Sequence, residues 1–321
     1  MNKYDYAHAV ARIRYNEIKL LKFKDIEQLI SLPNYEEVLT KIKELGYPLE
    51  KDEDAKKMLD EESIKAWELL QEIAPERKML DVFGILNSFH NLKSALKARI
   101  SHSKSEVYYL FPVSVETKVI EKAVETNDFS LLPDYMRQAA AKGYKALTEN
   151  QDGQLCEAIT DKAALSHFLE KSKETKCEEV IEIANLKCVE ANMKIAYRAA
   201  ITGKEKEFYD ASLSECDGID IYKLSKAAQK GVKELLEYLK TTEYQEASLL
   251  ISDSIAFEKW FDNSLIAIIE SAKVNPFGFA PLAAYWIAKE TEIKNIRILL
   301  NAKKNNVDNN TIRERMRRLY V

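Results

Sequence analysis

Histidine and cysteine most often carry metal and nucleophilic chemistry, and their spacing in this chain matches no common site. The four histidines form no HxxxH or HExxH pair, which argues against a zinc hydrolase; they are His8, His90, His102 and His167. The four cysteines form no CxxC motif and have no metal-ligand spacing; they are Cys156, Cys177, Cys188 and Cys216. We interpret the cysteines as small buried hydrophobic side chains in a reducing cytosol.

Motifs for phosphate and magnesium are missing as well. A nucleotide-binding loop needs glycines two to five residues apart, so that backbone N–H groups can approach the phosphates. This chain has 8 glycines in 321 residues, and no two of them are closer than ten positions. The densest acidic stretch is Asp52-Glu53-Asp54, and it has no second cluster with which to share a magnesium ion. There is no GxSxG motif either. We therefore predict a protein that is not an enzyme and binds no cofactor and no metal.

Positive charge at repeated positions is the first candidate binding feature. The bases Lys93, Lys194 and Arg297 occupy the same place in three similar segments. They are either exposed flanks of buried helices, with their stems along the apolar stripe, or the lining of a cavity around a pseudo-threefold axis that holds an acidic or polar partner. Spacing alone favours the first interpretation.

A basic tail is the second candidate. Arg313, Arg315, Arg317 and Arg318 surround Glu314 near the C-terminus. These arginines either complement the dipole of a terminal helix or contact lipid head groups or an acidic partner.

The segment that contains the three bases occurs three times. Each copy has Asn, an apolar residue, a base, an apolar residue five positions after the Asn and Ala seven positions after it; the copies are 91–98, 192–199 and 295–302. The copies are 101 and 103 residues apart. A fixed period indicates units that bury one face against their neighbours. We predict three similar helical modules, with boundaries at 1–105, 106–210 and 211–321.

The apolar pattern predicts helices almost throughout, hence an all-α fold. Gly46 and Gly143, which are 97 residues apart, are expected to end equivalent helices, and 107–112 is expected to be a linker. The expected helices are 7–23, 25–32, 35–45, 76–100, 131–141, 162–171, 177–200, 233–239, 257–272, one opened by Pro281, and 311–319 with Thr311 at its start.

Composition limits the partners. Lys and Arg number 48 against 52 Asp and Glu, a net charge of −4, which argues against nucleic acid as the main partner. Apolar residues make up 46% of the chain, enough for extensive cores. The longest uncharged run, between Lys273 and Lys289, has fifteen residues and is shorter than the roughly twenty that a membrane span needs. The N-terminal residues lack the apolar core of a signal peptide.

Two segments carry a resemblance to a known family. The residues 281–285 and 288–297 closely resemble the C-terminal signature of the central-stalk subunit of vacuolar (V-type) and archaeal-type rotary ATPases, called d or C. Residues 302–303 and 312–315 continue the match, and 6–14 with Leu20-Leu21 resemble the family's N-terminal helix. The loop 305–310 departs from the pattern where a glycine is expected, and Asn can replace glycine in a left-handed turn.

The resemblance implies an all-α funnel of three similar helical-bundle modules with pseudo-threefold symmetry. It implies a peripheral, non-catalytic rotor subunit on the cytoplasmic side of the membrane, which binds no nucleotide. Its partners would be the central shaft and the membrane ring of ion-carrying subunits, so that it couples ATP hydrolysis or synthesis to proton or sodium transport. The alternative is a soluble α-helical repeat scaffold that binds cytosolic proteins.

Overall fold

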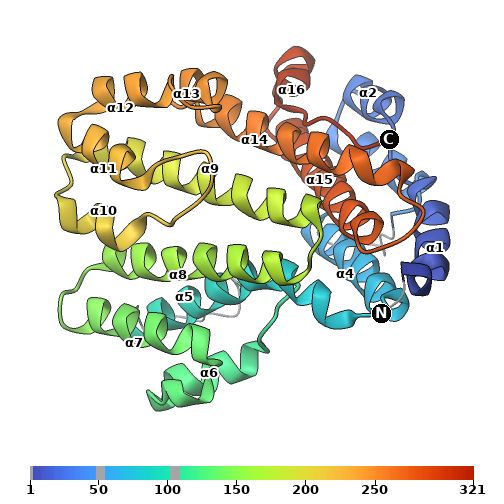
Figure 1. Ribbon diagram of the computed structural model, residues 1–321. Helices are drawn as coiled ribbons and strands as arrows, with labels where there is room; N and C mark the ends of the chain where they lie inside the picture. Colours follow the sequence, from blue (N-terminus) through green and yellow to red (C-terminus); the bar gives the residue numbers. More distant parts are fainter. Residues whose placement is uncertain (1–2, 48–54, 102–108) are drawn as a thin grey trace. The chain divides into compact units, whose positions relative to one another are not determined.

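The chain folds into two compact helical units in a computed structural model that describes residues 3–47, 55–101 and 109–321 (Figure 1). Unit 1 combines Met1–Arg77 with Asp253–Val321, and unit 2 is Lys78–Ser252. Helix makes up 78% of the structure, and no strand occurs in the described residues, so the predicted all-α class is confirmed. The predicted three-module division and funnel symmetry stay predictions.

Unit 1 is built around the long helix α15 (Ala280–Lys304), which packs against α1, α3, α4 and α14. Pro281 lies in its first turn, as expected, where the missing N–H costs no hydrogen bond. The other elements of unit 1 are η1 (Lys3–Tyr6), α1 (Ala7–Glu17), α2 (Phe23–Ser31), α3 (Tyr35–Glu44), α4 (Ala55–Ile73), α14 (Ser254–Ile269), η5 (Glu270–Val274) and α16 (Asn309–Arg315).

The core of unit 1 surrounds most of α15. Along its second half, Ile293, Ile296 and Leu299 are buried together with side chains of α2, α3 and α4. Nearer its start, the rings of Trp67 on α4 and Trp286 meet edge to face, with centroids 5.0 Å apart. Most residues of α15 are buried, and the polar ones among them, such as Lys289, Glu292 and Asn295, have partners inside the unit.

The predicted helix over 7–23 is wrong in its last six residues. Helix α1 ends at Glu17, and the chain turns through Leu20 and Leu21 before α2 begins at Phe23. Both leucines are buried, and the backbone N–H of Leu21 donates a hydrogen bond to Glu292 on α15. This long-range bond has no counterpart in the local sequence pattern, which favoured a continuous helix.

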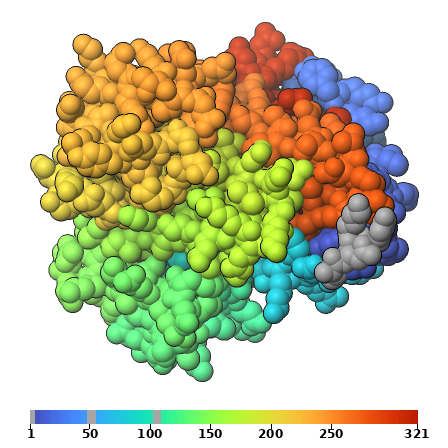
Figure 2. All heavy atoms as spheres, viewed as in Figure 1, coloured from blue at the N-terminus to red at the C-terminus, as the bar shows by residue number. Residues whose placement is uncertain are grey.

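Unit 2 is built around α8 (Gly153–Glu174), which packs against α5, α7, α9 and α10. Helices α8 and α9 (Glu178–Thr202) form an antiparallel hairpin through a short turn (Figure 1), and the atoms of the two helices adjoin in the space-filling view of Figure 2. The remaining elements are η2 (Arg77–Gly84), α5 (Ile85–Ser101), α6 (Thr117–Thr126), η4 (Phe129–Leu131), α7 (Asp134–Thr148), α10 (Lys206–Ser212), α11 (Ile221–Lys230), α12 (Val232–Leu239) and α13 (Gln245–Leu250).

The two glycines that were expected to end equivalent helices behave differently. Gly46 has φ +100° and follows α3, as a helix stop does. Gly143 lies inside α7, which continues to Thr148, and a Cβ there would stand 3.3 Å from both Cys156 and Thr160 of α8. The prediction for Gly143 is therefore wrong: this glycine lets two helices approach closely instead of ending one.

Two other predicted segments differ from the structure, and a third lies partly outside the described residues. The helix expected over 76–100 begins as the 3₁₀ helix η2 and becomes α5 only at Ile85. The acidic and polar run 52–62 favours a solvated helix or loop; residues 55–62 are helical in α4, but Met58 and Leu59 are buried there, and 52–54 lie outside the described residues. Of the predicted linker 107–112, residues 107 and 108 lie outside the described residues and 109–112 form no helix.

The C-terminal helix is shifted from its predicted position. It is α16, capped by the Asp308 carboxylate instead of Thr311, and it ends at Arg315 where 311–319 was expected. Before it, Asn306 takes φ +54°, so an asparagine does occupy the left-handed turn where the family pattern has glycine.

Candidate functional site

The described residues contain no group of three or more His, Cys, Asp or Glu side chains that could hold a metal ion. His167 stacks on Tyr135 with ring centroids 3.7 Å apart, and burial lowers its pKa. The candidate site therefore has to be sought in the repeated segment and the basic tail.

The three repeated segments lie in the three helices α5, α9 and α15, and in each the asparagine side chain binds a returning piece of backbone. Asn91 accepts a hydrogen bond from Leu110 N at 2.8 Å and donates one to Leu110 O at 3.0 Å. Asn192 does the same with Ser214, at 3.0 Å and 2.7 Å. We call each such pair of hydrogen bonds an asparagine clamp.

The third clamp, formed by Asn295 on Arg317, has the same geometry. Its two bonds measure 2.8 Å from Arg317 N and 3.0 Å to Arg317 O. The three asparagines are fully buried, and each binds a residue 19 or 22 positions further along the chain. A repeat seen as a sequence period is thus also a repeated tertiary interaction.

Each of the three bases forms an ion pair with an acid. Lys93 Nζ lies 2.5 Å from Asp161 on α8, Lys194 Nζ lies 2.9 Å from Glu190 one turn earlier on α9, and Arg297 lies 3.5 Å from Asp60 on α4. The exposed fractions of the three basic side chains are 19%, 26% and 51%. All three are thus held in place and still reach solvent, which fits both interpretations of these bases.

The acidic partners include a repeat that the sequence analysis missed. Asp60, Asp161 and Asp262 are spaced by 101 residues each, and they lie in α4, α8 and α14. Asp161 binds Lys93 and Asp60 binds Arg297, whereas Asp262 binds Lys294 at 2.5 Å and Arg317 at 2.9 Å. The shared period of these aspartates and of the asparagines was the signal that could have found them.

The signature in α15 forms a buried charge network in unit 1. Lys289 Nζ lies 2.8 Å from Glu292 and 2.9 Å from Glu62 on α4. The hydroxyl group of Tyr47 donates a hydrogen bond to Glu292. Burial alone would lower the pKa of Lys289, but the carboxylates of Glu292 and Glu62 outweigh it and raise that pKa. The network joins α15 to α4, to the turn after α1 and to the end of α3.

A cavity of about 830 Å³ lies in unit 1 next to this network, between α1, α4 and α15. Arg12, Lys19 and Lys65 give its lining a basic excess over Glu62, and the rings of Tyr15 and Tyr285 supply apolar surface. Arg12 is already paired with Glu72. Sequence reasoning did not single out this cavity because its residues come from four separate segments of the chain.

The four tail arginines differ in their surroundings. Arg317 is buried and bonded to Asp262, whereas Arg313 pairs with Glu27 at 2.9 Å and Arg318 with Glu270 at 2.6 Å, both on the surface. The half-buried Arg315 provides the carbonyl that Arg317 binds. Arg317 therefore has a partner inside unit 1, and the surface of the tail is formed by the other three.

Replacing a clamp asparagine by leucine is expected to destabilise the protein, because a backbone N–H and C=O lose their partner. We expect Asn192→Leu and Asn295→Leu to lower the free energy of unfolding by about 2–4 kcal/mol. Asn91→Leu should cost less, because Leu110 is 46% exposed and water can replace the amide. Guanidinium denaturation followed by circular dichroism measures all three.

The matched control for these variants is Asn301→Leu, because Asn301 is exposed on the same helix as Asn295. Its effect should stay within about 0.5 kcal/mol. Equal effects at Asn295 and Asn301 would contradict the clamp as a source of stability.

Replacing each of two glutamates of α15 by glutamine should change the free energy of unfolding in opposite directions. Burial raises the pKa of Glu290, although Ser63 donates a hydrogen bond to it at 2.8 Å. A raised pKa means that the ionised carboxylate destabilises the folded state above that pKa, and the penalty vanishes below the unfolded pKa near 4.5. Glu290→Gln should therefore raise the free energy of unfolding at pH 7 by on the order of 1 kcal/mol and change nothing near pH 4.

Glu292→Gln, two positions away, should instead lower the free energy of unfolding by about 2–4 kcal/mol at pH 7, because Lys289 loses one of its two buried partners. Urea titrations at pH 4 and pH 7 measure both variants. A stabilising Glu292→Gln would show that the network does not hold unit 1 together.

Comparison with known proteins identifies the family of this chain. Residues 9–315 match the family model described as ATP synthase (C/AC39) subunit. The chain is 25% identical to the C subunit of the V-type sodium ATPase of Enterococcus hirae over 317 residues, which are 96% of this chain and 97% of the relative. It is 24% identical to the C subunit of the A-type ATP synthase of Methanocaldococcus jannaschii, over 96% of this chain and 85% of the relative. No helix in the described part of the chain is long and apolar enough to span a membrane. The chain belongs to the C/AC39 family of V-type and A-type ATPase subunits.

Proposed function

We propose that this chain is a non-catalytic rotor subunit, a socket that links the central shaft of a rotary ATPase to the membrane ring of ion-carrying subunits. In this role it couples ATP hydrolysis or synthesis to proton or sodium transport. It acts as a peripheral subunit on the cytoplasmic side of the membrane. The observation that carries the proposal is the threefold recurrence of a buried asparagine clamp followed two residues later by a base.

A socket that passes torque has to resist deformation. Each clamp ties a long helix to a segment about twenty residues away through two hydrogen bonds that are shielded from water. In unit 1 the network around Lys289 adds buried ion pairs between α15 and α4. Few glycines also limit the backbone freedom of the helices.

The three bases form the proposed shaft interface. Lys93, Lys194 and Arg297 are equivalent by sequence period, and in the proposal the modules 1–105, 106–210 and 211–321 arrange them around one axis as a funnel. Each base is oriented by an acid of this chain and reaches solvent, so an acidic group of the shaft could share it. Arg313, Arg315 and Arg318 are the proposed contacts to the ring or to lipid head groups.

The relatives' names support the same interpretation. The bacterial relative is named as the C subunit of a V-type sodium ATPase, and the archaeal relatives are named as the C subunits of A-type ATP synthases. The named complexes thus include a sodium ATPase as well as ATP synthases. The choice between sodium and protons belongs to the ring in this proposal, because the socket carries no ion.

An affinity pull-down of the tagged chain from gently solubilised native membranes tests the proposal. We expect nucleotide-binding head subunits and a small, very hydrophobic ring protein to co-purify. Recovery of cytosolic proteins alone, with the chain absent from membranes, would contradict the rotor proposal and favour a scaffold that binds cytosolic proteins.

The shaft interface is tested by neutralising its bases. The triple variant Lys93→Gln, Lys194→Gln and Arg297→Gln should bind the purified shaft subunits at least tenfold more weakly, because three desolvated charge pairs are lost. Glutamine is preferred to glutamate, since a reversed charge would face Asp161, Glu190 and Asp60 and disturb the fold. Surface-immobilised shaft and a concentration series of each variant give the affinity.

The matched control neutralises one exposed base on each of the same three helices, Arg99, Arg198 and Lys304. This control removes the same total charge, so it should keep affinity within about twofold at physiological salt. Equal loss in both triple variants, or no loss in a folded first variant, would place the shaft interface elsewhere.

A further inference from the structure

Two of the four cysteines meet at the second asparagine clamp, although 28 positions separate them in the sequence. Cys188 lies on α9, and Cys216 lies in the turn that follows α10. The amide nitrogen of Asn192 is 3.8 Å from the sulfur of Cys188 and 3.3 Å from the sulfur of Cys216. The sulfur of Cys188 also lies 3.6 Å from the carbonyl oxygen of Glu215, the residue directly before Cys216.

The surroundings give the two thiols different chemical roles. Cys188 is fully buried and Cys216 is half-buried, so an oxidant can reach Cys216 first. The neighbouring thiol of Cys188 lowers the pKa of Cys216, and Asn192 adds to this effect, while burial and the acids Glu215 and Asp217 oppose it. The same pairing, together with burial, raises the pKa of Cys188. Cys216 is thus the nucleophile and Cys188 the resolving thiol.

We propose that Cys188 and Cys216 are an oxidation site, where a two-electron oxidant of the peroxide class forms a reversible intramolecular disulfide. This inference does not depend on the proposed function. It needs only the approach of the two sulfurs to the same side-chain nitrogen of Asn192, the half-exposed position of Cys216 and an oxidant that is small enough to reach it.

The reaction is balanced with hydrogen peroxide as the oxidant. The Cys216 thiolate attacks one peroxide oxygen, the O–O bond breaks, and the departing hydroxide takes up the proton released by the thiol, giving water and a sulfenic acid. The Cys188 sulfur then attacks the Cys216 sulfur, the S–O bond breaks, and hydroxide leaves with the Cys188 proton as a second water. Each sulfur loses one electron, peroxide gains two, and a dithiol reductant reverses the bond.

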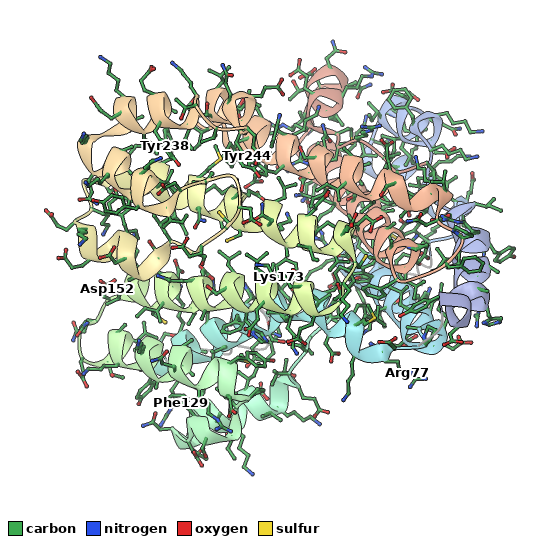
Figure 3. All side chains as sticks on the ribbon, viewed as in Figure 1. Arg77, Phe129, Asp152, Lys173, Tyr238 and Tyr244 are labelled. Atoms are coloured by element: carbon green, nitrogen blue, oxygen red, sulfur yellow. The ribbon has the colours of Figure 1, made fainter. Side chains whose placement is uncertain are left out.

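A disulfide at this place would tie α9 covalently to the segment that Asn192 already clamps. The turn that carries Cys216 is held by its neighbours: Asp220 N donates a hydrogen bond to Tyr238 Oη at 2.9 Å, and Gly218, with φ +84°, packs against Tyr244. Figure 3 labels both tyrosines, on α12 and at the start of α13. Because the turn is anchored on two sides, Cys216 stays beside Cys188 and the effective concentration of the two thiols is high.

The test exposes the purified full-length chain to stoichiometric hydrogen peroxide, blocks free thiols with N-ethylmaleimide and maps peptides by mass spectrometry without reduction. We expect a linked peptide pair containing Cys188 and Cys216, lighter by two hydrogen atoms and separated by dithiothreitol. Oxidation should raise the melting temperature by on the order of 5–10 °C, because the unfolded chain then contains a closed loop.

Variants separate the proposal from unspecific oxidation. The double variant Cys156→Ala and Cys177→Ala should form the link to the same extent as the parent chain. Cys188→Ser should leave Cys216 as a sulfenic acid that dimedone labels, and Cys216→Ser should show neither label nor link. Because the parent chain alone already reports the link, a variant that fails to fold leaves the test intact.

Three results would overturn the proposal. The first is N-ethylmaleimide on both cysteines after peroxide treatment. The second is Cys216 converted to sulfinic acid without a link. The third is a link found only between chains, seen as a dimer on a non-reducing gel.

Discussion

The rest of this structure depends on one interaction, the hydrogen-bonded pair between a buried asparagine and the backbone of a returning segment. A segment without regular structure brings an N–H and a C=O into the protein that no neighbouring helix can satisfy. The asparagine amide has one donor and one acceptor group at the spacing of a peptide, so it satisfies both. Asn91, Asn192 and Asn295 each do this once, which explains why the same residue recurs at each copy of the period.

The clamps also explain where elements end. Helix α16 stops at Arg315, Met316 takes an extended conformation, and Asn295 binds the backbone of Arg317 directly after it. In unit 2 the segment after α10 is held by Asn192 at Ser214, and the turn to α11 follows directly. The buried asparagine clamps, together with the apolar core, thus determine where helices end and where the chain turns.

Buried charged side chains in unit 1 also connect a helix to distant segments of the chain. Residues of α15 that resemble a family signature, Lys289 and Glu292 among them, bind Glu62, Tyr47 and the backbone of Leu21. A buried lysine with a single partner would be costly, and two carboxylates keep it charged. Packing and charge pairing within the unit therefore account for the places of Lys289 and Glu292 in α15.

The sequence by itself determined the helical class, the period of the three copies and most helix positions, because these follow from local apolar patterns, capping residues and proline. It also allowed the family to be identified from two short segments. Only the tertiary structure decided that Gly143 lies inside α7, that Arg317 is buried, and that Lys93 meets Asp161. The pairing of Cys188 with Cys216 belongs to the same group. Such contacts join residues from distant parts of the chain. Their partners are determined by how whole helices pack, and a local sequence pattern carries no information about that packing.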